Sequence, residues 1–334
     1  MATENKILVT GDFDIPPQLM SDRVVHLRVP QNDQDIIKHL TGVGHYIIGG
    51  PEYLHDTIMA SAPGLRHVVV MGTGTNSFVD MKAAQSHGIM VDNTPGINAD
   101  AVAEFALSSV ISNLANVYHS RDDLLAGGWY QKPHKTLSEA KIGIVGLGDI
   151  GSRLAKKIKA ISSAEVSYFS RSRKLDIETA IGLHFNSLPG LMTKSDAVIL
   201  CVTYTPETHH LLNNGTLSLA RDGQILLNFS NPKVVDPTAL KQGLIAQRPR
   251  RAFFDGYYNE WTSNQGLTSD PYGLLELGAD KFVATSHIAA QAESVIVAIL
   301  TEAFRKIEAR RNSPSFAPER NEMTGVHSVG LGRE

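Results

Sequence analysis

The sequence predicts an α/β protein with two doubly wound parallel sheets, and three observations support this fold class. Its 334 residues exceed the length at which a single hydrophobic core keeps growing, so two domains are expected. Short apolar runs of β character alternate with segments of helical spacing, which is typical of parallel sheets covered by helices on both faces. Near the middle of the chain a glycine-rich turn joins one such strand to the helix that follows it.

The first hundred residues form one unit of this kind. Two segments, Asp33–Leu40 and Met81–His87, have the apolar spacing of helices. Five short apolar runs predict strands, at Lys6–Thr10, Val24–Val29, His45–Ile48, His67–Met71 and Ile89–Val91.

The second unit opens with a predicted long helix that starts at Ala99 and stops at Gly127-Gly128. A strand at Lys141–Val145 and a helix at about Ile150–Ile161 flank the glycine turn. Later strands are expected at Val166–Phe169, Ala197–Val202, Gln224–Asn228, Arg251–Phe254 and Phe282–Thr285, before a final helix at about Ala292–Ala309. No fixed repeat interrupts this order.

Composition and charge exclude several classes of partner. A net charge of −3 and a pI near 6.5 lack the positive surface that nucleic-acid binding requires. No segment approaches a membrane-spanning length of apolar residues and the N-terminus lacks a secretion signal, so we expect no membrane partner and a cytoplasmic location. Because Cys201 is the only cysteine, no intrachain disulfide or thiolate metal cluster is expected, and its apolar surroundings predict a buried, unreactive thiol.

The turn from Gly146 to Gly151 has the pattern G-x-G-x-x-G between a strand and a helix. In this pattern Gly146 permits the tight turn, Gly148 lets the backbone approach a pyrophosphate, and Gly151 lets helix and strand pack closely. The helix N-terminus at Asp149 and Ile150 would hold the anion with free amides. A glycine turn without a ligand is the alternative, but the flanking strand and helix favour a dinucleotide site.

The second strand of this unit ends at Ser170-Arg171-Ser172, where an NAD site usually carries an acidic residue for the ribose 2′-hydroxyl. A carboxylate would repel a 2′-phosphate, whereas serine and arginine can bind it through charge-assisted hydrogen bonds. We therefore expect NADP(H) to be preferred over NAD(H). The alternative is that Arg171 and Arg173 are simply exposed at the end of a strand.

Three stretches carry a further pattern in their order and spacing. Residues 72–107 read GTGTNSFVDMKAAQSHGIMVDNTPGINADAVAEFAL, the glycine turn follows, and the third stretch runs from Asp196 through CVTYTPETHHLL, LLNFSNPKVVDPTAL and AFFDGYYNE to TSHIAA. Together they resemble the D-2-hydroxyacid dehydrogenase family, which includes glycerate, phosphoglycerate, D-lactate and formate dehydrogenases. The resemblance covers about residues 67 to 295.

The resemblance implies how the two units are organised. A Rossmann nucleotide domain, residues 99–288, would be inserted into a flavodoxin-like substrate domain formed by residues 1–98 and 289–334. Hinges near residues 98–101 and 288–293 would let the cleft between the domains close. The resemblance also implies a homodimer through the nucleotide domain and a small-molecule substrate.

The resemblance assigns His287 as the group that donates and accepts the substrate proton, with Glu260 orienting its imidazole. Histidine titrates near neutral pH, and a carbonyl needs a proton on oxygen as hydride reaches carbon. Asp255 would contact the nicotinamide carboxamide. The substrate would lie against Gly74, Thr75 and Asn76, and further cofactor contacts are expected at Val102, Ser170, Arg171, Ser172, Thr203, Pro206, Thr208, Phe229, Ser230 and His287.

Two positions depart from the family pattern. The family arginine that grips the substrate carboxylate should fall at Asn231, with glycine where Pro232 stands. Asparagine can donate hydrogen bonds but has no charge and no bidentate fork. Trp261 replaces the proline that usually follows the carboxylate, so the loop that carries Glu260 is expected to take a different path.

The leading hypothesis is therefore an NADP(H)-dependent oxidoreductase acting on a small hydroxy or keto substrate that is not a simple short 2-keto acid. Lys233 is a candidate for a replacement charge. The alternative is a catalytically silent nucleotide-binding regulator or scaffold on the same fold. Metal-dependent catalysis has no supporting ligand pattern, since His209 and His210 would face opposite ways on a strand.

Overall fold

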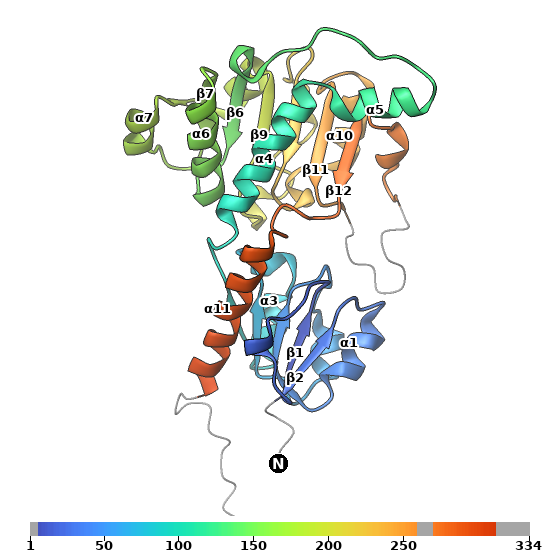
Figure 1. The fold of residues 1–334 in the computed structure, drawn as a ribbon, viewed down its shortest axis with the longest axis vertical. Helices are drawn as coiled ribbons and strands as arrows, with labels where there is room; N and C mark the ends of the chain where they lie inside the picture. Colours follow the sequence, from blue (N-terminus) through green and yellow to red (C-terminus); the bar gives the residue numbers. More distant parts are fainter. Residues whose placement is uncertain (1–5, 259–269, 312–334) are drawn as a thin grey trace, which may run out of the picture.

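The structure, a computed structural model, describes residues 6–258 and 270–311. These residues form two α/β units that lie one above the other in Figure 1. The first unit has helices α1 (Asp33–Leu40), α2 (Asp56–Ala60) and α3 (Met81–Ser86), with strands β1 (Lys6–Thr10), β2 (Val24–Leu27), β3 (Val43–Ile48), β4 (His67–Val70) and β5 (Met90–Asn93). Its strands are all parallel in the flavodoxin-like order β2-β1-β3-β4-β5.

The second unit is a seven-stranded parallel sheet in the order β12-β11-β10-β9-β6-β7-β8, which contains the Rossmann order of strands. Its strands are β6 (Lys141–Val145), β7 (Glu165–Phe169), β8 (His184–Phe185), β9 (Ala197–Leu200), β10 (Ile225–Asn228), β11 (Arg251–Asp255) and β12 (Phe282–Thr285). Its helices are α4 (Ala99–Leu114), α5 (Val117–Leu125), α6 (Asp149–Ile161), α7 (Leu175–Ile181), α8 (Leu188–Lys194), α9 (Asn214–Leu217) and α10 (Pro237–Ile245), and the chain then continues into α11 (Glu293–Arg311).

Helices α4 and α11 connect the two units, and each packs on a different sheet. Ala103, Ala106 and Val110 of α4 are buried in the core cluster of the seven-stranded sheet. Ile296 and Leu300 of α11 are instead buried against the five-stranded sheet. Figure 1 shows α11, the last helix of the described chain, lying beside the five-stranded unit that contains the first strand. The predicted class, an α/β fold with two doubly wound parallel sheets, is therefore confirmed.

The long helix expected from Ala99 to Gly127 is wrong in one respect, because it is two helices. α4 ends at Leu114 and α5 begins at Val117, since Asn116 adopts a left-handed conformation with φ of 58°. Asparagine is among the few residues that adopt this conformation readily, and a helix cannot continue through it. In the described residues no helix is long and apolar enough to cross a membrane.

The five-stranded unit contains two buried histidines next to α11. His45 on β3 and His67 on β4 have ring centroids 5.8 Å apart. Burial, together with the charges of His67, Arg311 and Arg23 and against the opposing charge of Glu308, lowers the pKa of His45 to about 4. His45 is therefore neutral in the folded protein near pH 7.

We expect the unit to lose stability as the pH falls from about 6.5, the ordinary histidine value, toward about 4. A depressed histidine pKa means that the unfolded chain binds the proton first, so acid favours unfolding by up to about 3 kcal/mol. Urea unfolding of wild type and His45→Leu at pH 7.5 and 5 measures this, and the variant should lose less stability between the two values. His184→Gln, at an exposed position, is the control, and equal pH dependence of all three proteins would contradict the assignment.

Candidate active site

The glycine turn lies at the point where the strand order of the seven-stranded sheet reverses, between β6 and β9. Ligands of open α/β sheets bind outside the carboxyl ends of the strands at this point. Gly146 has a φ of 98°, and a Cβ atom there would lie 2.5 Å from the carbonyl oxygen of Cys201. A Cβ atom on Gly151 would collide with the carbonyl oxygen of Gly146. Both glycines are therefore required by the packing of strand and helix.

Gly148 has open space where the other two are crowded. No heavy atom lies within 4 Å of the position that its Cβ atom would take. Gly148 is also the N-cap of α6, and the amides of Asp149 and Ile150 donate no hydrogen bond to any part of the chain that the structure describes. Free amides and open space at a helix N-terminus fit the pyrophosphate of a dinucleotide.

The two arginines after β7 differ in their contacts. Arg173 forms two hydrogen bonds with Glu178, of 2.8 and 2.7 Å, and Tyr168 donates a third to the same carboxylate. The Arg173 and Tyr168 contacts lower the pKa of Glu178 to about 2. Arg171 is exposed and has no hydrogen bond or ion pair with another described residue. Arg171 therefore remains available to a ligand, whereas Arg173 serves the protein.

The loop after β9 carries three of the predicted cofactor contacts. Thr203 and Thr208 are joined by a 2.8 Å hydrogen bond from the Thr208 hydroxyl to the Thr203 carbonyl oxygen, and Pro206 begins the short helix η4 (Pro206–Thr208) between them. The pKa of Glu207 in this loop is lowered mainly by its hydrogen bond with Thr205. The charge of Arg171 also lowers it, so Arg171 interacts electrostatically with the loop. The end of β7 and this loop therefore lie within electrostatic range of each other.

Three other predicted cofactor residues are largely enclosed. Val102 on α4 is 6% exposed. Ser230 is 9% exposed, and its hydroxyl accepts a 2.8 Å hydrogen bond from the Val202 amide. Phe229 lies edge-on against Phe105 at 6.3 Å between ring centroids. The cofactor contacts of these residues stay predictions.

His287 follows β12 and has a φ of 56°, a left-handed conformation that is strained for histidine. Asp255, at the end of the adjacent strand β11, holds the loop in this shape. Its carboxylate accepts hydrogen bonds from the Thr285 hydroxyl at 2.7 Å and from the amides of Ile288 and Ala289 at 2.8 and 3.0 Å. Asp255 thus fixes the backbone on both sides of His287, a role that the sequence did not predict.

The predicted substrate loop reaches the same place from the other unit. It contains the short helix η2 (Thr75–Ser77), and Phe78 directly after it lies 6.5 Å from His287 between ring centroids. In the described chain, the amides of Gly74, Thr75 and Asn76 donate no hydrogen bond, which leaves them available to a substrate oxygen. The structure therefore brings this loop and His287 together, and the roles expected of them stay predictions.

Asn231 joins the two units at this place. Its side-chain oxygen accepts a 3.0 Å hydrogen bond from the Lys233 amide, which makes Asn231 the N-cap of the short helix η5 (Pro232–Val234). Its Nδ2 atom donates a 3.0 Å hydrogen bond to the Ser77 hydroxyl. Pro232 explains the local shape, because the residue before proline is extended, here with ψ of 135°.

The expectation that His209 and His210 would face opposite ways is wrong. Their rings stack at 3.9 Å between centroids, because His210 is in a left-handed conformation with φ of 50° rather than on a strand. Across residues 6–258 and 270–311 the structure contains no group of three or more histidine, cysteine or acidic side chains placed to hold a metal. Burial raises the pKa of Cys201 to about 12, which agrees with an unreactive thiol.

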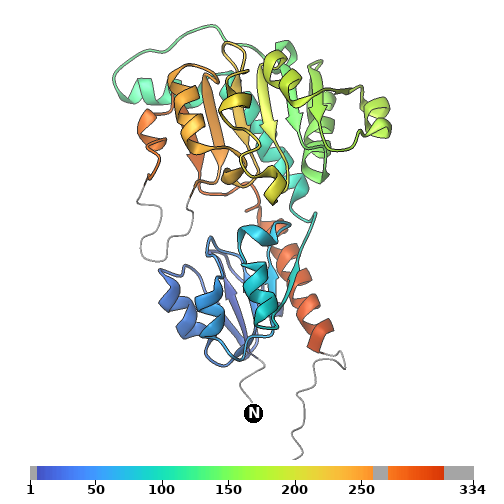
Figure 2. The same ribbon diagram turned by 180° about the vertical axis from the view of Figure 1, so that it is seen from behind.

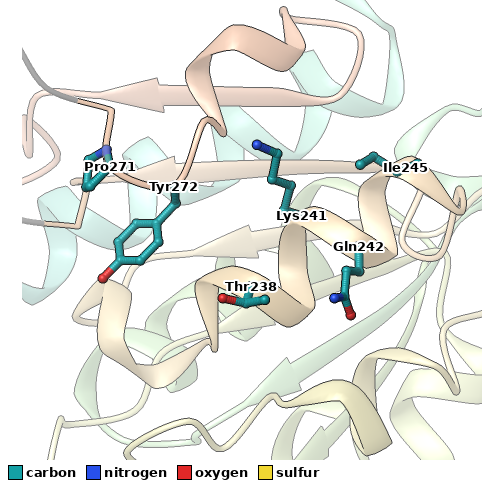
Figure 3. Close-up of a pocket in the computed structure, with 6 residues that line it drawn as sticks. All are labelled: Thr238, Lys241, Gln242, Ile245, Pro271 and Tyr272. Carbon is teal, nitrogen blue, oxygen red and sulfur yellow. The ribbon is translucent and has the colours of Figure 1, made fainter.

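Figure 3 shows an open pocket of about 300 Å³ elsewhere in the seven-stranded unit. It lies between α10 and the chain after residue 270, and it is lined by Thr238, Lys241, Gln242, Ile245, Pro271 and Tyr272. No predicted site residue lines it. Glu260 and Trp261, the predicted orienting carboxylate and the proline replacement, lie outside the described residues.

A dinucleotide-type glycine turn, a histidine from the last strand and a substrate loop from a second unit define the class, a two-unit nucleotide-binding α/β protein. The model of the D-isomer specific 2-hydroxyacid dehydrogenase NAD binding domain matches residues 107–289. The chain belongs to the D-isomer specific 2-hydroxyacid dehydrogenase family, as its motifs predicted.

Relatives agree with this family, and a solved structure has the same fold. A glyoxylate reductase of Pyrococcus horikoshii is 34% identical over 63% of this chain and 66% of its own length. A second glyoxylate reductase, from Thermococcus kodakarensis, is 31% identical over 67% of this chain and 71% of its own length. The matches thus span about two thirds of these relatives. The crystal structure of Aquifex aeolicus D-lactate dehydrogenase, complexed with NAD and lactic acid, has the same fold, with a TM-score of 0.75, 21% identity, and 92% of this chain and 95% of that chain covered.

The sequence did not predict two residues as members of the candidate site. Ser77 directly follows the predicted substrate residues and is the one that meets Asn231. Tyr53, after β3, is a second candidate, because burial, with smaller contributions from Asp80 and Tyr204, raises its pKa. Only its position after the carboxyl end of a strand could have indicated Tyr53.

Proposed function

We propose that the protein is an NADP(H)-dependent oxidoreductase of the D-2-hydroxyacid dehydrogenase type, transferring hydride between the nicotinamide and a small hydroxy or keto substrate. The observation that carries this proposal is the meeting of His287 and Asn231 with Phe78 and Ser77 of the other unit. These residues follow the carboxyl ends of strands, the edge on which the glycine turn also lies. The family assignment supports the class of enzyme, an NAD(P)-dependent dehydrogenase acting on a CH–OH group.

In this proposal a bound nicotinamide supplies or accepts the hydride, and the chain handles the proton. His287 protonates the carbonyl oxygen in reduction and removes the hydroxyl proton in oxidation. Asp255 keeps the His287 loop in its left-handed shape, so the imidazole is already placed before the substrate arrives. Glu260 is proposed to orient the imidazole, and the amides of Gly74, Thr75 and Asn76 to bind the substrate.

The substrate is proposed not to be a simple short 2-keto acid. The relatives named above are glyoxylate reductases, and a short 2-keto acid such as glyoxylate needs its carboxylate neutralised in the cleft. Asn231 stands where the family pattern has arginine, and both ends of its amide already serve the protein. This same position supports the second candidate function, a nucleotide-binding regulator without catalysis.

Cofactor choice is proposed to depend on Arg171. We expect NADPH to bind more than about tenfold more tightly than NADH, because one charge-assisted contact with a 2′-phosphate contributes about 1.4 kcal/mol or more. Ser170→Asp combined with Arg171→Ala should reverse the preference. Fluorescence titration of both nucleotides with each protein measures it.

A matched control distinguishes the loss of this contact from the loss of one positive charge elsewhere in the protein. Lys159→Gln removes one positive charge at the far end of α6, where the lysine bonds to the Ala164 carbonyl, and should leave the ratio of dissociation constants unchanged. Equal dissociation constants for NADPH and NADH in the wild-type protein would refute the proposed preference.

A homodimer through the nucleotide unit is proposed from an exposed apolar surface. Leu124 and Leu125 at the end of α5 are 58% and 70% exposed, and Trp129 just after them is 79% exposed. Figure 2 shows this part of the chain running along the outside of the seven-stranded unit. The domain division at residues 99 and 288 is proposed from the packing of α4 and α11, and a cytoplasmic location stays a prediction.

A further inference from the structure

The structure assigns a specificity role to Ser77, which no sequence motif indicated. We infer that Ser77 and Asn231 form a neutral donor pair that selects an uncharged carbonyl substituent, such as an amide or ester, next to the reacting carbonyl. This inference rests on the proposed function, because it names the substrate class of the same cleft. Its first support is the direction of the hydrogen bond between the two residues.

The direction of that hydrogen bond follows from the Asn231 cap. The Lys233 amide can only donate, so the atom it meets at 3.0 Å is the Asn231 side-chain oxygen. The other end of the amide, Nδ2, therefore faces Ser77 and donates to its hydroxyl oxygen at 3.0 Å. Ser77 thus accepts from Asn231 and keeps its own proton, which no other described residue receives. The second Nδ2 hydrogen of Asn231 is a further donor.

The pair is neutral, and within residues 6–258 and 270–311 no positively charged side chain is bonded to it. No lysine or arginine side chain forms a hydrogen bond with Ser77 or Asn231 among the residues that the structure describes, and Lys233 contributes only its backbone amide. Ser77 and Asn231 are both partly buried. Placing a carboxylate there would remove it from water without an opposite charge, whereas a neutral carbonyl needs only donors.

The donor pair is joined to the proposed proton donor through Phe78. Phe78, directly after Ser77, lies against His287, so the donor pair and the proposed proton donor are next to each other. Ser77 also lies close to the loop backbone, with its hydroxyl oxygen 3.5 Å from where a Gly74 Cβ atom would be. A substrate with two adjacent carbonyl groups would therefore meet His287 with one and the donor pair with the other.

The test uses two isosteric pairs, each with and without the carboxylate. Pyruvate and pyruvamide serve as substrates with NADPH, and oxamate and oxamide serve as ligands of the NADPH-loaded protein. We expect the neutral member to be favoured at least tenfold in kcat/KM and in dissociation constant. Ser77→Ala should lower the neutral ligand's advantage about threefold to tenfold, the range of one hydrogen bond, and Ser77→Thr should restore it.

Asn231→Asp tests the positioning role. Aspartate keeps the cap on Lys233 but would accept the Ser77 proton, so the neutral ligand should lose affinity while NADPH binding stays unchanged. Preference of the wild type for pyruvate and oxamate would overturn the inference. If Lys233→Met then lost that preference, Lys233 would be the residue that supplies the positive charge for the carboxylate. An unchanged ratio in Ser77→Ala would overturn it as well. No turnover of either substrate, with oxamide still favoured in binding, would refute the proposed catalysis and keep the inferred specificity.

Discussion

Replacing His287 with asparagine is expected to lower kcat by about 100-fold or more, the usual contribution of a positioned proton donor. Asparagine is the suitable replacement because it adopts the left-handed conformation that His287 has here, with φ of 56°. The loop held by Asp255 should therefore keep its shape. Steady-state NADPH oxidation with a carbonyl substrate measures the loss, and the NADPH dissociation constant should change little.

The control for this variant is His184→Asn, an exposed histidine on β8 in the same unit, which should keep full activity. If His287→Asn lost NADPH binding together with turnover, His287 would have a structural role. Unchanged turnover would remove the central residue of the proposed mechanism.

Replacing Asn231 with arginine is expected to raise kcat/KM for short 2-keto acids and to lower it for the natural substrate. Arginine supplies a fixed charge and two parallel donors to a carboxylate, each charge-assisted contact contributing about 1.5–3 kcal/mol. KM and kcat should improve together for the acids, because the added group serves both binding and carbonyl polarisation. Steady-state kinetics with glyoxylate and hydroxypyruvate measure both parameters.

The same change removes the cap on Lys233 and the bond to Ser77, so some stability should be lost, about 1 kcal/mol for the cap. Asn231→Gln is the matched control, because it lengthens the side chain without adding charge and should not raise activity on the acids. A similar gain with glutamine would show that the missing charge is not the reason for poor use of 2-keto acids.

The sequence predicted the fold class because the apolar period is strong in most elements. The strands at β1, β6 and β12 and the helix α1 have the predicted bounds, since each is a continuous run ended by glycine, polar or capping residues. The short helices α7 to α9 were expected only as unbounded parts of strand–helix repeats, because segments of four to seven residues carry too little periodicity to fix their ends. The break at Asn116 was also missed, since one left-handed residue leaves the apolar pattern unchanged.

The candidate site could be predicted only where a local motif carried it. The glycine turn and the His287 motif are local, and the structure places them after the carboxyl ends of β6 and β12, two strands of the same sheet. The bond between Asn231 and Ser77 spans 154 residues of sequence, and no local pattern predicts such a contact. The difference between Arg171 and Arg173 was hidden for a related reason, because it depends on Glu178 pairing with only one of them.

The most direct test of the account is NADPH oxidation by the wild-type protein with glyoxylate, hydroxypyruvate, longer 2-keto acids and uncharged ketones and aldehydes. The account predicts turnover of an uncharged carbonyl compound and, for the short 2-keto acids, kcat/KM well below about 10⁴ M⁻¹s⁻¹, the lower end of ordinary enzymes. Nucleotide binding without turnover of any compound would favour the regulator. Values above about 10⁴ M⁻¹s⁻¹ with glyoxylate would contradict the role assigned to Asn231.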